Sequence, residues 1–75
     1  MPKIISANLN GIRSAAKKGF FEWMSKQDAD FVCVQELKAQ APDMTPEFLT
    51  PGDYVGYFHY AEKKGYSGVG LYSKS

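Results

Sequence analysis

Two β-rich runs separated by a segment of helical length are the feature that most constrains how this chain can fold. The first run spans Lys3–Leu9 and has two β-branched isoleucines, Ile4 and Ile5, near its start. The second, Phe31–Gln35, opens with four consecutive apolar residues, as a buried strand does. A strand–helix–strand crossover of this kind is almost always right-handed and makes its two strands parallel. The sequence therefore predicts an α/β fold built on a parallel pair of strands.

The connecting segment, residues 14–27, has the periodicity of an amphipathic helix. Apolar residues recur there at four-residue spacing, at Ala16, Phe20 and Met24, with Trp23 beside them. We expect Phe20, Trp23 and Met24 to lie in the core. Gly19 weakens the middle of such a helix by about 1 kcal/mol relative to Ala. One helix, or a short turn followed by a helix from Phe20, fits the pattern equally well.

The second half of the chain predicts two further strands, at 54–60 and 69–73. The segment 40–54 between the second and third strands reads as a loop with one helical turn. Thr45 can cap that turn, and Pro46 suits the first helical position because its missing N–H is not needed there. The expected order is therefore β-α-β-β-β.

Length and composition limit the chain to one small domain of 75 residues. The net charge of +1 says little about binding partners, but two basic stretches flank an acidic middle, where seven acids and one base lie from Asp28 to Glu62.

Cys33 is the single cysteine, which excludes an internal disulfide, and its place in an apolar run favours the role of a small buried hydrophobic residue. No signal-peptide core or membrane-spanning run is present in the sequence, so a cytoplasmic location is expected.

Three polar side chains leave the parallel strands where these strands end. Asn8 lies at the end of the first strand and Asn10 just after it, and Glu36 follows the second. Because the carboxyl ends of parallel strands share one edge, where ligands bind in open α/β sheets, these side chains should gather. Carboxylate and amide oxygens suit Mg²⁺. The alternatives are an exposed acid paired with Lys38, and asparagines that serve only the turn.

Two basic segments are candidates for phosphate or nucleic-acid contacts. The loop "AEKKGYSGVG" contains two lysines, glycines and a tyrosine that could contact sugars or bases, and three basic residues follow the first turn. The candidates are Lys63, Lys64, Tyr66, Arg13, Lys17 and Lys18. A solvated hairpin loop and the wet face of a helix are the alternatives. His59 has no second histidine or cysteine partner for a metal, so a packed histidine is expected.

Together, the stretches "KIISANLNGIRSAAKKGF", "DFVCVQELKA" and "EKKGYSGVGLYSK" resemble, in order and spacing, the start of the exonuclease III family of apurinic/apyrimidinic (AP) endonucleases. That family belongs to the endonuclease/exonuclease/phosphatase superfamily. The resemblance covers the whole chain and is loosest at 41–54. It implies the N-terminal part of a four-layered α/β sandwich, two mixed sheets flanked by helices, so that residues 1–75 are an incomplete segment of a single domain.

The resemblance also implies roles for individual residues. Glu36 matches the glutamate that binds the catalytic Mg²⁺ (Mn²⁺ is possible), and Asn8 matches the asparagine that joins or supports this site. Asn10 stands where some relatives have aspartate and is assigned to DNA binding. Arg13, Lys17, Lys18, Lys63, Lys64 and Tyr66 are the other DNA contacts implied.

The function implied is Mg²⁺-dependent hydrolysis of duplex DNA, both 5′ to abasic sites and from 3′ ends, by a monomeric DNA-repair hydrolase. The family's water-activating aspartate, its histidine–aspartate couple and its later active-site tyrosine and asparagines lie beyond the equivalent of Ser75. The segment alone, with no catalytic residue other than its metal site, is therefore expected to be inactive and poorly soluble. A non-catalytic nucleic-acid-binding module and a phosphatase-like member of the superfamily are the alternatives.

Overall fold

The structure, a computed structural model, describes residues 2–61 and 68–74. Its strands are β1 (Ile4–Asn8), β2 (Phe31–Gln35), β3 (Tyr54–His59) and β4 (Val69–Lys74). Its helices are α1 (Ile12–Lys17), α2 (Phe20–Gln27), the 3₁₀ helix η1 (Ala41–Asp43) and α3 (Pro46–Leu49). Within the described residues, no helix is both long enough and apolar enough to cross a membrane.

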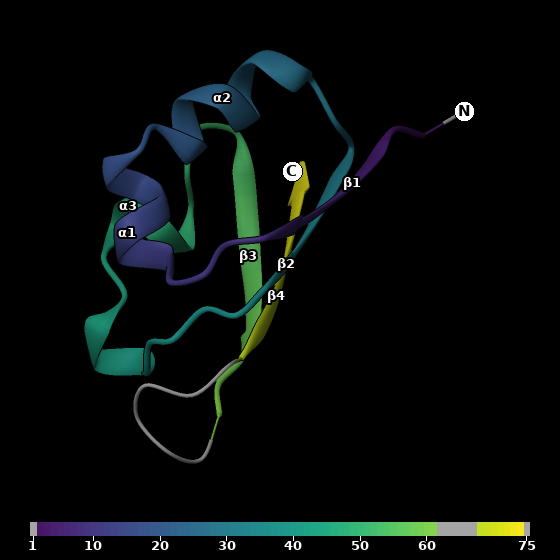
Figure 1. The fold of residues 1–75 in the computed structure, drawn as a ribbon. Coiled ribbons are helices and arrows are strands. Elements are labelled where there is room, and N and C mark those ends of the chain that lie inside the picture. The colour runs from purple at the N-terminus through teal and green to yellow at the C-terminus, as the bar shows by residue number, and fades with distance from the viewer. Residues whose placement is uncertain (1, 62–67, 75) are drawn as a thin grey trace.

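The strands form one mixed sheet in the order β1-β2-β4-β3 (Figure 1). β1 and β2 are parallel, with Asn8 opposite Gln35 at the end of the pair. β4 is antiparallel to both of its neighbours, β2 and β3. The predicted α/β class and the parallel crossover are confirmed, and β2 has the predicted bounds.

The crossover contains two short helices rather than one long helix. Gly19 adopts the left-handed region at φ 91° between α1 and α2, so the chain takes the second of the two alternatives considered for 14–27. In the loop before β3, the Thr45 hydroxyl accepts a hydrogen bond from the Phe48 backbone N–H at 3.4 Å, and Pro46 begins α3, as predicted. The 3₁₀ helix η1 was not predicted from the sequence.

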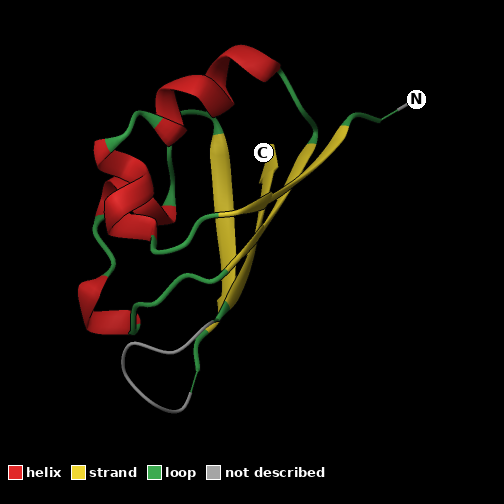
Figure 2. Ribbon diagram, viewed as in Figure 1, coloured by secondary structure: helices red, strands yellow, loops and turns green. Residues whose placement is uncertain are grey.

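All helices pack on one face of the sheet (Figure 2), and the core lies between the two layers. Met24 is 1% exposed and Tyr72 is fully buried, and Phe20 packs against the core from its edge. The Tyr72 hydroxyl donates to the Phe48 carbonyl at 2.5 Å, and the Tyr54 hydroxyl donates to the Ala29 carbonyl at 2.5 Å. The expectation for Trp23 was wrong: it is 45% exposed, whereas its neighbour Met24 is the residue of α2 that is buried.

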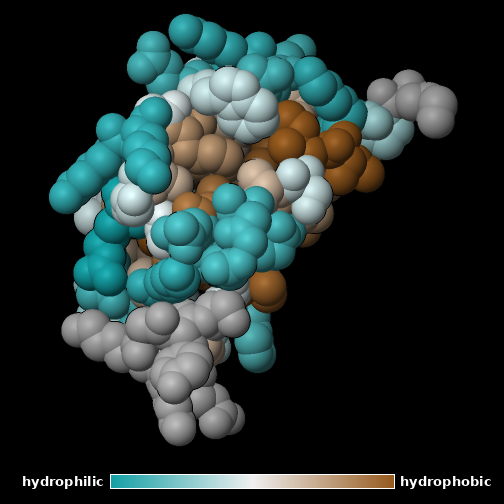
Figure 3. All heavy atoms as spheres, in the orientation of Figure 1, coloured by the Kyte–Doolittle hydropathy of each residue, from teal (hydrophilic) through white to brown (hydrophobic). Residues whose placement is uncertain are grey.

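Among the described residues, no helix lies on the opposite face of the sheet. Strand register places on it four exposed apolar side chains, those of Ile4, Phe31, Tyr57 and Val69. Figure 3 shows apolar surface on the side of the molecule where β1 lies. Cys33 and His59 also lie on this face, where Cys33 is half-buried and His59 is exposed. Both were expected to pack inside the core, and both expectations were wrong.

Candidate functional site

The carboxyl ends of β1 and β2 bring Asn8 and Glu36 into direct contact. The Asn8 Nδ2 group donates a hydrogen bond to the Glu36 carboxylate, Oε2. Both residues follow from local sequence: Asn8 is the last residue of β1, and Glu36 comes directly after β2. The predicted gathering of these two side chains at one sheet edge is therefore confirmed.

Asn10 and Lys38 extend this contact into a chain of hydrogen bonds. The Asn10 backbone N–H donates to Asn8 Oδ1 at 2.9 Å, and the Lys38 ammonium donates to Asn10 Oδ1 at 2.6 Å. The alternative considered for Lys38, an ion pair with Glu36, is not the contact found. The four side chains run in the order Lys38, Asn10, Asn8, Glu36, and Glu36 lies at the end of the chain.

The backbone of this edge is held in a conformation that most residues avoid. Asn10, Glu36 and Lys38 have positive φ angles of 50°, 54° and 52°. Non-glycine residues occupy this left-handed region at a cost of about 1–2 kcal/mol each, and such strain clusters at functional sites. Three strained residues within one edge therefore mark it as the leading candidate site.

Backbone hydrogen bonds and buried side chains keep the two turns together. The Gly11 N–H donates to the Glu36 carbonyl at 2.8 Å, and the Ile12 N–H donates to the Leu37 carbonyl at 2.9 Å. Ile12 and Leu37 are both fully buried. The polar side chains thus project from a rigid base, which is what a preorganised site requires.

The basic residues predicted to contact phosphate fall in two places. The Arg13 guanidinium donates to the Lys38 carbonyl at 3.3 Å and lies 4.0 Å from the Asp43 carboxylate, so it borders the edge. Lys18 lines an open pocket with Asn8, Asn10, Phe20 and Trp23, whereas Lys17 is exposed on the last turn of α1. Lys63, Lys64 and Tyr66 lie outside the described residues.

Two residues of this site were not among the predicted site residues. Lys38 was considered only as an ion-pair partner of Glu36, although its place two residues after Glu36 could have indicated a role in the same turn. Trp23 lines the Lys18 pocket with an exposed indole, and only the break at Gly19 could have indicated this. The places of Lys38 and Trp23 in the site depend on the directions of their side chains, which sequence spacing alone does not give.

The oxygens at this edge fit part of a site for a hard cation. Glu36 supplies a carboxylate, which Mg²⁺ accepts together with water and phosphate oxygens. Asn8 donates its N–H to that carboxylate, and its own oxygen accepts from the Asn10 backbone N–H, so in this arrangement it holds Glu36 in place. Among the described residues, no group of three or more His, Cys, Asp or Glu side chains could hold a metal ion.

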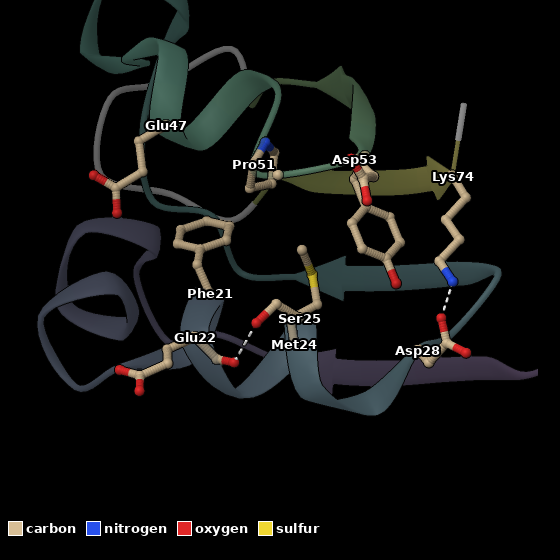
Figure 4. Close-up of a pocket in the computed structure, with 11 residues that line it drawn as sticks. Phe21, Glu22, Met24, Ser25, Asp28, Glu47, Pro51, Asp53 and Lys74 are labelled. Atoms are coloured by element: carbon tan, nitrogen blue, oxygen red, sulfur yellow. Dashed lines mark hydrogen bonds and ion pairs between the residues drawn. The ribbon is translucent and has the colours of Figure 1, made fainter.

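A second pocket lies at the other end of the sheet, where β2 and β3 begin and β4 ends (Figure 4). Phe21, Met24 and Tyr54 form its apolar part, and most of its polar groups are carboxylates. The Lys74 ammonium bonds to the Asp28 carboxylate at its rim, which lowers the pKa of Asp28. This contact ties the end of β4 to the segment before β2.

The fold and the edge define a class: an α/β protein that presents a carboxylate–amide pair and basic side chains at the carboxyl ends of parallel strands. The chain belongs to the endonuclease/exonuclease/phosphatase family, whose family model matches residues 5–75.

Its relatives include DNA-repair nucleases. The chain is 44% identical over 73 residues to an exodeoxyribonuclease of Bacillus subtilis, covering 96% of this chain and 28% of that protein. It is 36% identical over 72 residues to the DNA-(apurinic or apyrimidinic site) endonuclease of Dictyostelium discoideum, covering 96% and 20% respectively. The chain thus spans less than a third of the length of these curated relatives.

Solved structures of AP endonucleases have the same fold over this segment. The AP endonuclease of Archaeoglobus fulgidus matches with a TM-score of 0.83 and 29% identity, over 97% of this chain and 27% of that one. The catalytic domain of Xenopus laevis APE2 matches with a TM-score of 0.79 and 37% identity, over 96% and 23%. The chain is therefore homologous to part of the exonuclease III and AP endonuclease catalytic domain.

Proposed function

We propose that this chain is the N-terminal segment of a DNA-repair nuclease of the exonuclease III type. Such an enzyme hydrolyses duplex DNA 5′ to abasic sites and digests it from 3′ ends. The observation that carries the proposal is the Asn8–Glu36 contact at the carboxyl ends of β1 and β2. The family membership and the exodeoxyribonuclease and AP endonuclease relatives support it.

Glu36 is the proposed ligand of a divalent cation, Mg²⁺ or Mn²⁺, and Asn8 is its support. When bound, the cation would polarise a phosphate of the DNA and stabilise the charge that develops as water attacks. Asn8 orients the carboxylate by donating to Oε2, so that the remaining lone pairs of Glu36 would be available to the cation in one fixed direction. The remaining cation ligands and the water-activating groups would come from the rest of the enzyme.

The basic residues around the edge are the proposed DNA contacts. Arg13 bonds to the Lys38 carbonyl, Lys18 lines the pocket that includes Asn8 and Asn10, and Lys17 lies in the last turn of α1. Asn10 would face the DNA backbone from the same edge. The loop residues Lys63, Lys64 and Tyr66 are proposed contacts from the sequence alone. Lysine and arginine contacts to phosphate supply affinity that falls with added salt.

The uncovered face of the sheet is the proposed packing surface for a second sheet. Ile4, Phe31, Tyr57 and Val69 would be buried there in a four-layered sandwich, of which residues 1–75 form one part. A sheet that exposes such side chains is an aggregation hazard when it stands alone. We propose that the complete enzyme is a monomeric cytoplasmic protein without a membrane segment.

The test is incision of a labelled DNA duplex that carries one abasic site, by the full-length protein that contains this segment. With Mg²⁺ we expect cleavage 5′ to the abasic site, and with EDTA none. Glu36→Gln should lower the rate at least about 100-fold, because removal of a supporting group alone costs 10–100-fold. Glu22→Gln is the matched control, since Glu22 is an exposed acid of α2 that forms an ion pair with Lys26, away from the Asn8–Glu36 contact.

Two other results would replace the proposal, and a third would overturn only the expectation that the segment alone is inactive. DNA binding that needs no Mg²⁺ and survives Glu36→Gln, without incision, would indicate a nucleic-acid-binding module. Release of phosphate from a phosphomonoester, without cleavage of the duplex, would indicate a phosphatase-like enzyme. Mg²⁺-dependent incision by the purified 75-residue chain would show that the segment is sufficient for turnover, which we do not expect.

A further inference from the structure

Lys38 occupies a fixed position beside the Asn8–Glu36 pair. Its neighbours Leu37 and Ala39 are buried, at 0% and 2% exposure, so the backbone on both sides of it is anchored in the core. Its carbonyl accepts a hydrogen bond from Arg13 at 3.3 Å. The ammonium group reaches back to the first turn and donates to Asn10 Oδ1 at 2.6 Å. Lys38 therefore links the turn after β2 to the turn after β1.

This link bears on the orientation of the Asn8 carboxamide. An asparagine side chain has one oxygen that accepts and one NH₂ group that donates. The Asn8 oxygen accepts from the Asn10 backbone N–H at 2.9 Å, so the NH₂ group is turned to Glu36. The reverse orientation would set the amide oxygen against the carboxylate. Whatever holds the Asn10 backbone in place thus decides which end of Asn8 meets Glu36.

Asn10 needs such support because its backbone is in the left-handed region, at φ 50°. Asparagine tolerates this region better than most residues, but in an exposed turn other conformations compete. The Lys38 ammonium is a charged donor, and charge-assisted hydrogen bonds are about twice as strong as neutral ones. It therefore stabilises the one conformation of Asn10 that aims its N–H at Asn8.

We propose that Lys38 is a positioning residue for the cation site: through Asn10 and Asn8, it fixes the orientation of the Glu36 carboxylate. The inference rests on the proposed function, because that function makes Glu36 the cation ligand. It assigns a role in binding the cation to a positively charged side chain, whose ammonium group has no lone pair to offer as a ligand.

A simple charge argument predicts the opposite effect. A lysine near a divalent cation repels it, so removal of the charge should tighten cation binding. A positioning role predicts that removal of Lys38 weakens cation binding, because Asn10 and then Asn8 lose their fixed orientation. The sign of the change in affinity therefore separates the two roles.

The experiment measures Mn²⁺ binding to the full-length protein without DNA, from the electron paramagnetic resonance signal of free Mn²⁺. Lys38→Met should weaken binding about tenfold, the lower end of the effect of outer-shell groups on metal affinity. Lys38→Arg keeps the charge and a donor, and it should bind at least about threefold more tightly than Lys38→Met. Lys26→Met is the control and should match the wild type, since Lys26 is an exposed lysine paired with Glu22 on α2.

A second variant tests the same hydrogen bond from its other end. Asn10→Gly removes the acceptor of the Lys38 ammonium but keeps the backbone N–H and suits a positive φ. It should weaken Mn²⁺ binding by about the same factor as Lys38→Met. Addition of Lys38→Met to Asn10→Gly should change the affinity little further, because two residues that act through one bond are not additive.

Equal or tighter Mn²⁺ binding by Lys38→Met would overturn the inference, as would additive effects of the two substitutions. If Lys38→Met does not fold, the inference is overturned when Asn10→Gly binds Mn²⁺ as tightly as the wild type. Failure of the proposed function looks different: the wild type would then bind Mn²⁺ no better than Glu36→Gln. Loss of binding in Glu36→Gln with no change in Lys38→Met would leave the proposed function intact and remove this inference alone.

Discussion

Replacement of Tyr72 by phenylalanine tests how the buried polar contacts of the core contribute to stability. Tyr72 is fully buried, and its hydroxyl donates to the Phe48 carbonyl at 2.5 Å. A typical internal hydrogen bond contributes about 1 kcal/mol, and a buried acceptor that loses its donor costs about 1–3 kcal/mol. The ring contacts with Phe21 and Phe58 remain in the variant. We therefore expect Tyr72→Phe to lower the free energy of unfolding by about 1–2 kcal/mol at pH 8.

The cost of this substitution should disappear at alkaline pH. Burial is the main cause that raises the pKa of Tyr72 far above its ordinary value of 10.0, and the nearby Tyr60 adds to it. The unfolded chain loses the phenolic proton near pH 10, whereas the folded protein keeps it. The hydroxyl's stabilisation is thus fully present below pH 10 and is lost as the pH rises toward the folded pKa, by about 1.4 kcal/mol per pH unit. Wild type and variant should become equally stable at about pH 11.

Urea unfolding of the full-length protein at several pH values between 8 and 11.5 measures both effects. A constant difference between the wild type and Tyr72→Phe across this pH range would refute the assignment of Tyr72 as a buried neutral phenol.

Three further predictions concern the sheet and its ends. Gly56→Ala should destabilise the protein by about 1–3 kcal/mol in urea unfolding, because the added Cβ would lie 2.5 Å from the Phe58 ring and 2.8 Å from the Leu49 carbonyl oxygen. Asp28→Asn should reduce the loss of stability at acidic pH, because the Lys74 contact lowers the pKa of Asp28. The stabilisation that the Asp28 carboxylate contributes is present above pH 3.8 and is lost as the pH falls through the pKa of Asp28 in the folded protein. Unfolding midpoints at pH 7 and pH 3 measure this change. The isolated 75-residue chain should aggregate, as light scattering would detect, because its uncovered sheet face exposes Ile4, Phe31, Tyr57 and Val69; a sharp cooperative melt would contradict this.

Much of the fold was predictable because its signals are local. The β-branched run at Ile4, the apolar run from Phe31 and the Thr45–Pro46 cap each specify their element within a few residues. The gathering of Asn8 and Glu36 also followed from sequence, since a parallel crossover places both strand ends at one edge. These inferences need only the periodicity of the apolar residues and the relative direction of the strands.

The remaining features depend on where side chains point, which sequence spacing does not give. Trp23 has the spacing of a core residue, three positions after Phe20, yet it is 45% exposed. His59 and Cys33 alternate correctly within their strands but lie on the face that no helix covers. Lys38 bonds to Asn10 rather than to Glu36, because the turn after β2 directs its side chain toward the turn after β1.

The strain at Glu36 yields a last prediction, which concerns why a glutamate is present there at all. At φ 54° a glycine would be unstrained, whereas any residue with a Cβ carries a conformational cost. Glu36→Gly and Glu36→Ala both remove the carboxylate and its hydrogen bond from Asn8, so the two variants differ mainly in backbone strain. We expect Glu36→Gly to be more stable than Glu36→Ala by about 1 kcal/mol, in contrast to an ordinary strand or helix position, where Gly is the less stable by about 0.5–1 kcal/mol. Urea unfolding of the two full-length variants measures the difference, and an equally or more stable alanine variant would mean that the turn does not hold this geometry. If glycine is favoured and neither variant cleaves abasic DNA, the glutamate is maintained against the preference of the backbone, which is the expected property of a residue retained for its chemistry.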